Sequence, residues 1–191
     1  MSQNANTDQQ ARTVTAVDHG KLDLKSLTLY AILLAAGFVL NLTVSKFFSG
    51  LTGGFLSPEF IIAAFCLEIL AIKPNLGQAA VIGLLAGFVI QITASVKGPD
   101  LIAEPVAAVV MSALVSAFGN SKAKGALPLV GTFVVTFISG LIYAVIFSFL
   151  IMKNPAFVGV MAPVVAATGV ANAVIVSALY LPIKKALKLN D

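Results

Sequence analysis

Charged residues are scarce in this chain. Of its 191 residues only 10% are charged and 59% are hydrophobic, and the mean hydropathy is +1.00. A soluble domain carries roughly 25% charged residues because its surface faces water, and a small domain leaves a large share of its surface exposed. The composition therefore excludes a soluble globular protein and indicates a protein that lies in a lipid bilayer.

Residue types that often carry catalysis are also scarce. Cys66 is the only cysteine, which excludes an intrachain disulfide, and its apolar neighbours favour a packing role. His19 is the only histidine, so neither a Ser–His triad nor a multi-histidine metal site can be built. No glycine-rich phosphate loop followed by Lys and Ser/Thr occurs. We therefore expect no enzyme, no metal, no cofactor and no ATP site within this chain.

Long apolar segments dominate what is present. A spanning helix needs about 20 largely apolar residues, and six such segments follow a polar cytoplasmic leader, residues 1–25. The sequence thus predicts an all-α integral membrane protein with one six-helix membrane domain, 26–185, and a short cytoplasmic tail, 186–191. The second segment is short, which indicates that it is tilted, shielded by protein or extended into its flanks. The predicted spans are 27–45, 58–72, 77–95, 101–118, 128–152 and 163–183.

The basic residues predict the orientation. With the N-terminus in the cytoplasm, nine basic residues lie on the inner side and three on the outer side, as the positive-inside rule requires. This count needs an even number of spans, so both termini are expected in the cytoplasm. Topology also explains the net charge of +4, and we expect no nucleic-acid partner. The outer three are Lys46, Lys97 and Lys153.

Acidic residues gather at the predicted outer ends of spans two and four. Glu59 follows Ser57-Pro58, a sound helix start in its own right, or else it faces an outward cavity. Asp100 and Glu104 are four residues apart and share one helix face. Two such acids repel each other unless a cation lies nearby. That cation is either Lys97 or the ammonium group of a bound substrate.

Polar and small residues also recur at helical spacing inside the spans. Gly83 and Gly87 predict a close approach of another helix. Gln91 continues their stripe and either bridges helices or contacts a ligand. Asn172 lies one turn after Thr168 in span six and repeats this pattern. Span five carries a similar stripe of Ser139, Tyr143 and Phe147.

The segment 46–57 is expected to be a loop after span one. It combines glycines, which supply hinges, with Phe47, Phe48 and Phe55, which supply apolar surface. It either gates an outer pocket or rests on the lipid headgroups. Within span one, Ala31 and Ala35 form a small face that suits helix contact, either inside the protein or with another protein.

Together these features resemble the substrate-binding S components of energy-coupling factor transporters. Those are six-span proteins of about this size, with both termini inside, no ATP-binding motif and an Ala-xxx-Ala pattern in the first helix. The resemblance implies that Ala31 and Ala35 contact a transmembrane coupling subunit and that two cytoplasmic ATPases complete the complex. It also implies an outward-facing pocket roofed by the loops after spans one, three and five.

Within that group, residues 25–185 look most like the tryptophan transport protein family. The match rests on the Pro58-Glu59 start of span two with Phe60-Ile61-Ile62-Ala63 after it, and on Gly98-Pro99 followed by Glu104. One difference is that Pro105 follows Glu104 where a basic residue is frequent in the family. The resemblance implies a cell-membrane protein that captures tryptophan, or a related aromatic amino acid, from outside.

A tryptophan zwitterion would need three kinds of partner. Glu104, with Asp100 or Glu59, would bind its ammonium group. Lys97 or the N–H groups of a helix start would bind its carboxylate.

The third partner is an apolar wall for the indole, for which Phe55 and the other Phe residues of the segment 46–57 are the candidates. Gln91 or Asn172 would accept the indole N–H. Three alternatives stay open: a self-sufficient ion-coupled secondary transporter, an S component for another vitamin or cofactor, and a membrane scaffold without transport activity.

Overall fold

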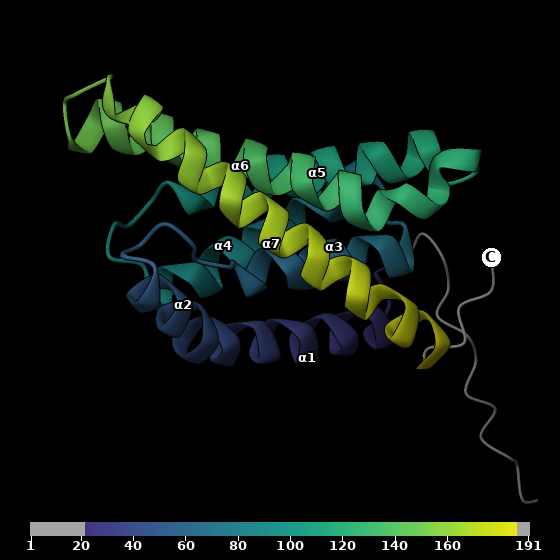
Figure 1. Ribbon diagram of the computed structural model, residues 1–191. Helices are drawn as coiled ribbons and strands as arrows, with labels where there is room; N and C mark the ends of the chain where they lie inside the picture. The colour runs from purple at the N-terminus through teal and green to yellow at the C-terminus, as the bar shows by residue number, and fades with distance from the viewer. Residues whose placement is uncertain (1–21, 187–191) are drawn as a thin grey trace, which may run out of the picture.

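The computed structural model describes residues 22–186, and this part of the chain is helical, without a β-strand (Figure 1). Most of the predicted C-terminal tail and most of the predicted leader, including His19, lie outside the described residues. The helices form one bundle, and the two ends of the described chain lie at the same end of it.

The first long helix, Leu24–Leu51, is continuous but changes its winding midway. It consists of α1 (Leu24–Leu40), the π-helical turn η1 (Asn41–Ser45) and α2 (Lys46–Leu51). The loop expected at 46–57 is therefore wrong for its first half, because no proline or glycine interrupts residues 41–49. The chain turns only afterwards, where Gly53 and Gly54 adopt φ values of 62° and 89° that favour glycine.

Two of the remaining helices, Leu76–Thr93 and Asp100–Phe118, match the predicted spans to within two residues, whereas the last two helical stretches begin six residues before the predicted starts at 128 and 163. In α4 an Asn75–Gln78 capping box fixes the first turn. In the stretch Lys122–Ile151, a 3₁₀ turn and a π-helical turn precede the α-helix, and another π-helical turn follows it. The elements are α4 (Leu76–Thr93), α5 (Asp100–Phe118), η2 (Lys122–Ala126), η3 (Leu127–Gly131), α6 (Thr132–Ile146), η4 (Phe147–Ile151) and α7 (Phe157–Ala186).

Within the described residues, five helical stretches are long and apolar enough to cross a membrane. The sixth, α3 (Phe60–Ile72), has 13 residues and spans only about 20 Å at 1.5 Å per residue. Every residue from Ile61 to Ile72 is buried, because α1, α4, α5, α6 and α7 all pack on this helix. Of the three explanations for its shortness, the structure shows shielding by protein.

The close approach predicted at Gly83 and Gly87 is found between α4 and α5. A Cβ atom would lie 2.4 Å from the backbone oxygen of Glu104 at Gly83, and 2.8 Å from that of Asp100 at Gly87. Glycine at these positions therefore lets the two backbones touch. On the other side of α4, the Tyr30 hydroxyl donates to the Ile82 carbonyl at 2.6 Å and ties α1 to the bundle.

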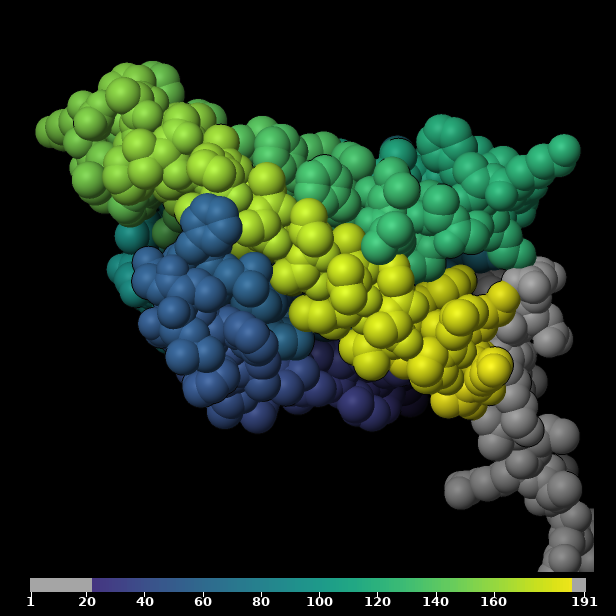
Figure 2. All heavy atoms as spheres, viewed as in Figure 1, coloured from purple at the N-terminus to yellow at the C-terminus, as the bar shows by residue number. Residues whose placement is uncertain are grey.

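The outer surface of the bundle is apolar. Figure 2 shows α7 running obliquely across one face, with α1 and α2 on one side of it and the α5–α6 region on the other. Large hydrophobic side chains such as Ile32 (62% exposed), Ile92 (69%) and Leu150 (72%) point outward. Such a surface is compatible with a multi-pass membrane protein, in which these side chains contact lipid.

Candidate functional site

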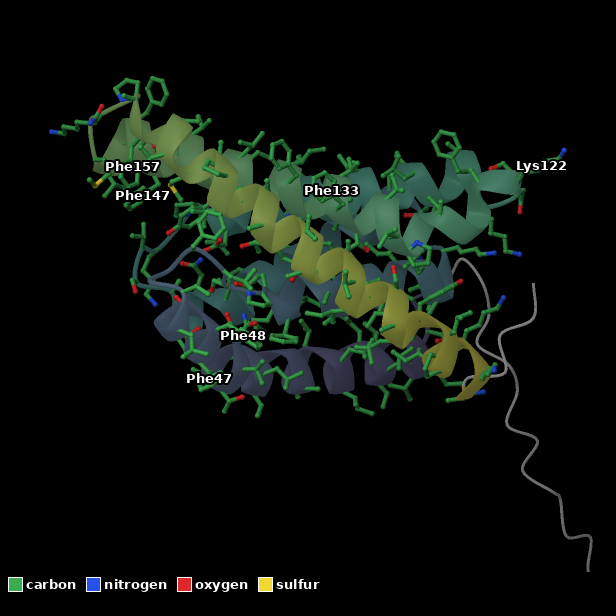
Figure 3. All side chains as sticks on the ribbon, viewed as in Figure 1. Phe47, Phe48, Lys122, Phe133, Phe147 and Phe157 are labelled. Atoms are coloured by element: carbon green, nitrogen blue, oxygen red, sulfur yellow. The ribbon has the colours of Figure 1, made fainter. Side chains whose placement is uncertain are left out.

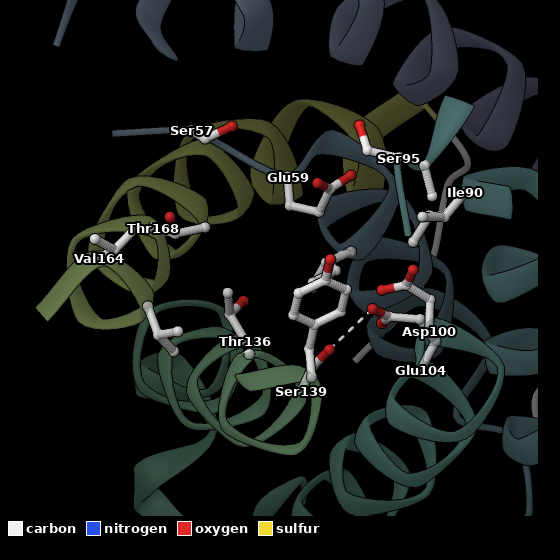
Figure 4. Close-up of a pocket in the computed structure, with 15 residues that line it drawn as sticks. Ser57, Glu59, Ile90, Ser95, Asp100, Glu104, Thr136, Ser139, Val164 and Thr168 are labelled. Atoms are coloured by element: carbon white, nitrogen blue, oxygen red, sulfur yellow. Dashed lines mark hydrogen bonds between the residues drawn. The ribbon is translucent and has the colours of Figure 1, made fainter. Parts of the chain in front are cut away.

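A cavity of about 300 Å³ lies between α3, α5, α6 and α7 (Figure 4). It lies toward the end of the bundle that carries α2 and the α6–α7 connection. In Figure 4 the Asp100 and Glu104 side chains lie on one side, with Ser57, Thr168 and Val164 opposite. Its wall consists of Ser57, Glu59, Ile62, Ile90, Ala94, Ser95, Asp100, Glu104, Thr136, Ser139, Gly140, Tyr143, Val164, Val165 and Thr168.

Glu104 is the most deeply buried acid of this wall, with 2% of its surface exposed. Its Oε1 accepts a hydrogen bond from the Ser139 hydroxyl at 2.8 Å, drawn in Figure 4. Its Oε2 is buried and has no hydrogen-bond partner among the described residues. A buried oxygen without a partner is costly, so this carboxyl group is equipped to accept one more donor.

Asp100 and Glu104 share the cavity-facing side of α5. Asp100 is the first residue of the helix, where the positive end of the helix dipole favours a carboxylate. The Gln91 side chain donates to its Oδ2 at 3.3 Å. Because Gly83 and Gly87 admit α5 so closely, the contact between α4 and α5 fixes the position of both acids.

Glu59 precedes the first turn of α3 and is held by two asparagines from other helices. Asn41, in the π-helical turn of the first helix, donates through its Nδ2 to the Glu59 carboxyl group and accepts from the Phe60 N–H at 2.7 Å. Asn172 on α7 accepts from the Glu59 N–H at 2.9 Å and donates to Thr136 Oγ1 at 3.3 Å. This cross-brace, made of Asn41, Glu59, Asn172 and Thr136, joins the first helix, α3, α6 and α7 beside the cavity.

The lining is acidic without a counter-charge. Glu59, Asp100 and Glu104 contribute three carboxyl groups, and no Lys, Arg or His belongs to the wall among the described residues. Hydroxyl groups and aliphatic side chains supply the rest. Within residues 22–186 no three His, Cys, Asp or Glu side chains are arranged to hold a metal ion. The arrangement can accept hydrogen bonds from a cationic group and surround an apolar body.

The structure brings some of the predicted site residues together and separates others. Glu59, Asp100 and Glu104 line one cavity, and Gln91 and Asn172 lie behind it as hydrogen-bond partners of Asp100 and Glu59.

The other predicted residues lie elsewhere. Lys97 does not line the cavity, and its ammonium group donates to the Gln91 carbonyl. Phe55 is 53% exposed and is not part of the wall. Ala31 and Ala35 are exposed on the outer face of α1.

Sequence reasoning missed several residues of the site, among them the polar residues Asn41 and Thr136. Asn41 interrupts the apolar run 27–45, and a lone amide within a span is a signal that could have pointed to it. Thr136 carries no such signal, because threonine is common within spans. The stripe of Ser139 and Tyr143 was recognised as polar, and the structure places both residues in the wall.

A comparison of the chain with protein-family models, with curated proteins and with solved structures found no match in any of the three.

Proposed function

We propose that this protein is a membrane receptor subunit that captures a small amine-bearing molecule from outside the cell for uptake. The observation that carries the proposal is the composition of the cavity. Three carboxyl groups face about 300 Å³ of space with no basic side chain in the described wall, and one oxygen of Glu104 lacks a partner. A ligand ammonium would supply both the missing charge and the missing donor.

The size and remaining wall of the cavity suit a compact organic cation. Binding sites for small molecules typically combine an apolar lining with a few placed polar groups. Here Ile62, Ile90 and Val165 provide apolar surface, and Tyr143 and Thr168 provide hydroxyl groups. Tryptophan remains our specific candidate, on the strength of the resemblance to the tryptophan transport protein family. Its ammonium would bind Glu104, and its carboxylate would have the hydroxyl groups as partners.

The proposed assembly follows from the same resemblance. We place the protein in the cell membrane with six membrane-embedded helices and both termini in the cytoplasm, as the basic residues predict. A transmembrane coupling subunit would bind the exposed face of Ala31 and Ala35, and two cytoplasmic ATPases would drive uptake. The small residues there allow close packing of a partner helix.

Three matched indole ligands test the binding step on the purified chain in detergent. Tryptamine carries only the ammonium, indole-3-propionate only the carboxylate, and tryptophan carries both. A ligand that binds the folded state raises the melting temperature. We expect tryptamine and tryptophan to do so and indole-3-propionate to have no effect. Stabilisation by indole-3-propionate alone would contradict an acidic amine site.

A pair of carboxyl variants assigns the effect to the cavity. We expect Glu104→Gln to weaken amine binding by about tenfold to a hundredfold, because a hydrogen bond between two charged groups is lost. Glu68→Gln is the control, since Glu68 is also fully buried but lies outside the cavity wall. Equal affinities of the Glu104→Gln protein and the unaltered protein would refute the assignment.

An ion-coupled secondary transporter is the second candidate. Glu68 favours it, because both of its carboxyl oxygens are buried without a hydrogen-bond partner among the described residues, and buried acids in membrane helices often carry protons or cations. Uptake in cells that lack the ATPase subunits separates the two. Uptake that persists there and collapses with a protonophore would favour this candidate, whereas its loss supports the receptor subunit.

A further inference from the structure

A second cavity, of about 430 Å³, lies at the opposite end of the bundle from the acidic one. It lies between the α5–α6 connection and the last turns of α7, which Figure 2 shows side by side, and η3 packs on α7 there. Figure 3 places Lys122 at this end, far from Phe47 and Phe157 at the other. Its wall consists of Ser121, Lys122, Lys124, Gly125, Pro128, Ser177, Tyr180, Leu181 and Lys184.

The wall of this cavity is basic. Lys122 and Lys124 reach it from η2 and Lys184 from α7. The Ser177 hydroxyl is buried and has no hydrogen-bond partner there. Three ammonium groups with hydroxyl donors beside them form the chemical complement of a phosphate group.

The surroundings indicate that the phosphate belongs to a lipid. Leu181, in the same wall, is 60% exposed, and Leu179 beside it is 43% exposed. On the other side of the α5–α6 connection, an apolar hollow of about 200 Å³ is lined by residues that include Phe118 and Val130. The basic cavity is therefore flanked by surface that suits acyl chains, and basic pockets between membrane helices bind anionic headgroups.

We propose that this cavity, the lysine pocket, binds the phosphate headgroup of an anionic glycerophospholipid in the adjoining leaflet. The lipid anchors the α5–α6 connection to the end of α7. This site is independent of the amine site, since the two cavities share no residue.

Native mass spectrometry of the full chain tests the proposal. The protein is incubated in detergent with equimolar phosphatidylglycerol and phosphatidylcholine, and the bound lipid is counted. We expect selective retention of phosphatidylglycerol. In the Lys124→Gln/Lys184→Gln protein its retained fraction should fall about tenfold or more, because each lysine near a headgroup contributes to binding. Equal retention of the two lipids by the unaltered protein would overturn the proposal.

The matched control removes the same charge at the same end of the bundle. Lys73 and Lys185 lie outside the lysine pocket, so Lys73→Gln/Lys185→Gln should retain the lipid. An equal loss in both double variants would show diffuse surface attraction and overturn the pocket. Lys124→Arg/Lys184→Arg keeps the charge and should restore binding, which separates loss of the site from misfolding.

A free phosphate compound is the remaining alternative occupant. Glycerol 1-phosphate at millimolar concentration carries the headgroup chemistry without acyl chains. We expect it to leave phosphatidylglycerol bound and the melting temperature unchanged. Displacement of the lipid by glycerol 1-phosphate would assign the pocket to a soluble phosphate instead.

Discussion

Asn41 links parts of the chain that are far apart in sequence. Its side chain donates to the Glu59 carboxyl group and accepts the N–H of Phe60, one of the N–H groups that a helix start leaves without partners. The π-helical turn η1 begins at this residue. Such turns occur frequently at functional sites. One amide thus both caps α3 and orients an acid of the candidate amine site.

Replacing this amide should therefore affect two properties. We expect Asn41→Ala to destabilise the protein by about 1–3 kcal/mol, because a partly buried donor and acceptor lose their partner, and to weaken amine binding several-fold. Asn75→Ala is the control, since Asn75 caps α4 at an exposed position away from the cavity. It should lower the melting temperature without changing affinity. Unaltered amine binding by the Asn41→Ala protein would show that Asn41 is only a helix cap.

Asp23, at the start of α1, should make the stability of the folded protein depend on pH. The Ser26 N–H donates to its carboxylate at 2.8 Å and holds the pKa of Asp23 below its ordinary value of 3.8. Because this pKa is lower in the folded state, the charge stabilises the protein above about pH 4 and ceases to do so as the pH falls. We expect the unaltered protein to melt slightly above Asp23→Asn at pH 7, and we expect this difference to shrink as the pH falls below 4. A difference that grows on acidification would contradict this contact.

At the scale of elements, the contact between the backbones of α4 and α5 sets the position of one wall of the cavity. The carbonyl groups of Glu104 and Asp100 face Gly83 and Gly87 across the α4–α5 interface. Any side chain at these glycines would move α5 and with it two of the three acids. The interface between α4 and α5 thus helps to position the candidate amine site, although neither glycine lines the cavity.

Replacing a glycine by alanine, which adds one methyl group, tests this interface. At Gly83 it would lie 2.4 Å from a backbone oxygen, so we expect Gly83→Ala to destabilise by about 1–3 kcal/mol through overpacking and to weaken amine binding. Gly159→Ala in α7 meets open space and should be neutral or slightly stabilising, because alanine favours helix. Melting temperature and ligand affinity report both effects. Equal melting temperatures for the two variants would disprove the contact.

The elements differ in how well the sequence predicts them. The segment predicted at 101–118 corresponds to α5, Asp100–Phe118, and that predicted at 77–95 corresponds to α4, Leu76–Thr93. Local signals fix these boundaries: a capping residue or a proline precedes each helix, and polar residues follow it. The π-helical turn at Asn41 has no such local signal, and it lies where the first helix contacts α3.

The burial of α3 in protein could be predicted only as one of three alternatives, for a different reason. Burial in lipid and burial in protein both select apolar residues, so a uniformly apolar helix looks the same in either surroundings. Only its length of 13 residues hinted at the difference. The acids were found as candidates because charge is rare in this chain, whereas their common cavity depends on how α3 and α5 pack.

The proposed orientation of the whole molecule can be tested with one thiol at a time. The native Cys66 is fully buried and should not react with a membrane-impermeant maleimide. We expect Lys153→Cys to be labelled on intact cells and Lys122→Cys only after permeabilisation, because they lie at opposite ends of the Lys122–Ile151 segment. The reverse labelling pattern would invert the topology.

The position of α3 has a consequence for how the protein is made. This helix leaves the ribosome before α4, α5, α6 and α7, all of which pack against it in the finished molecule. With 13 residues it is shorter than the roughly 30 Å of hydrocarbon it would have to cross, so lipid alone offers it no stable position. Its final surroundings are complete only when α7, the last helix of the described residues, packs on it. The cross-brace between Glu59 and Asn172 can form only once α7 is present, so the wall of the candidate amine site is completed after α7 has been synthesised.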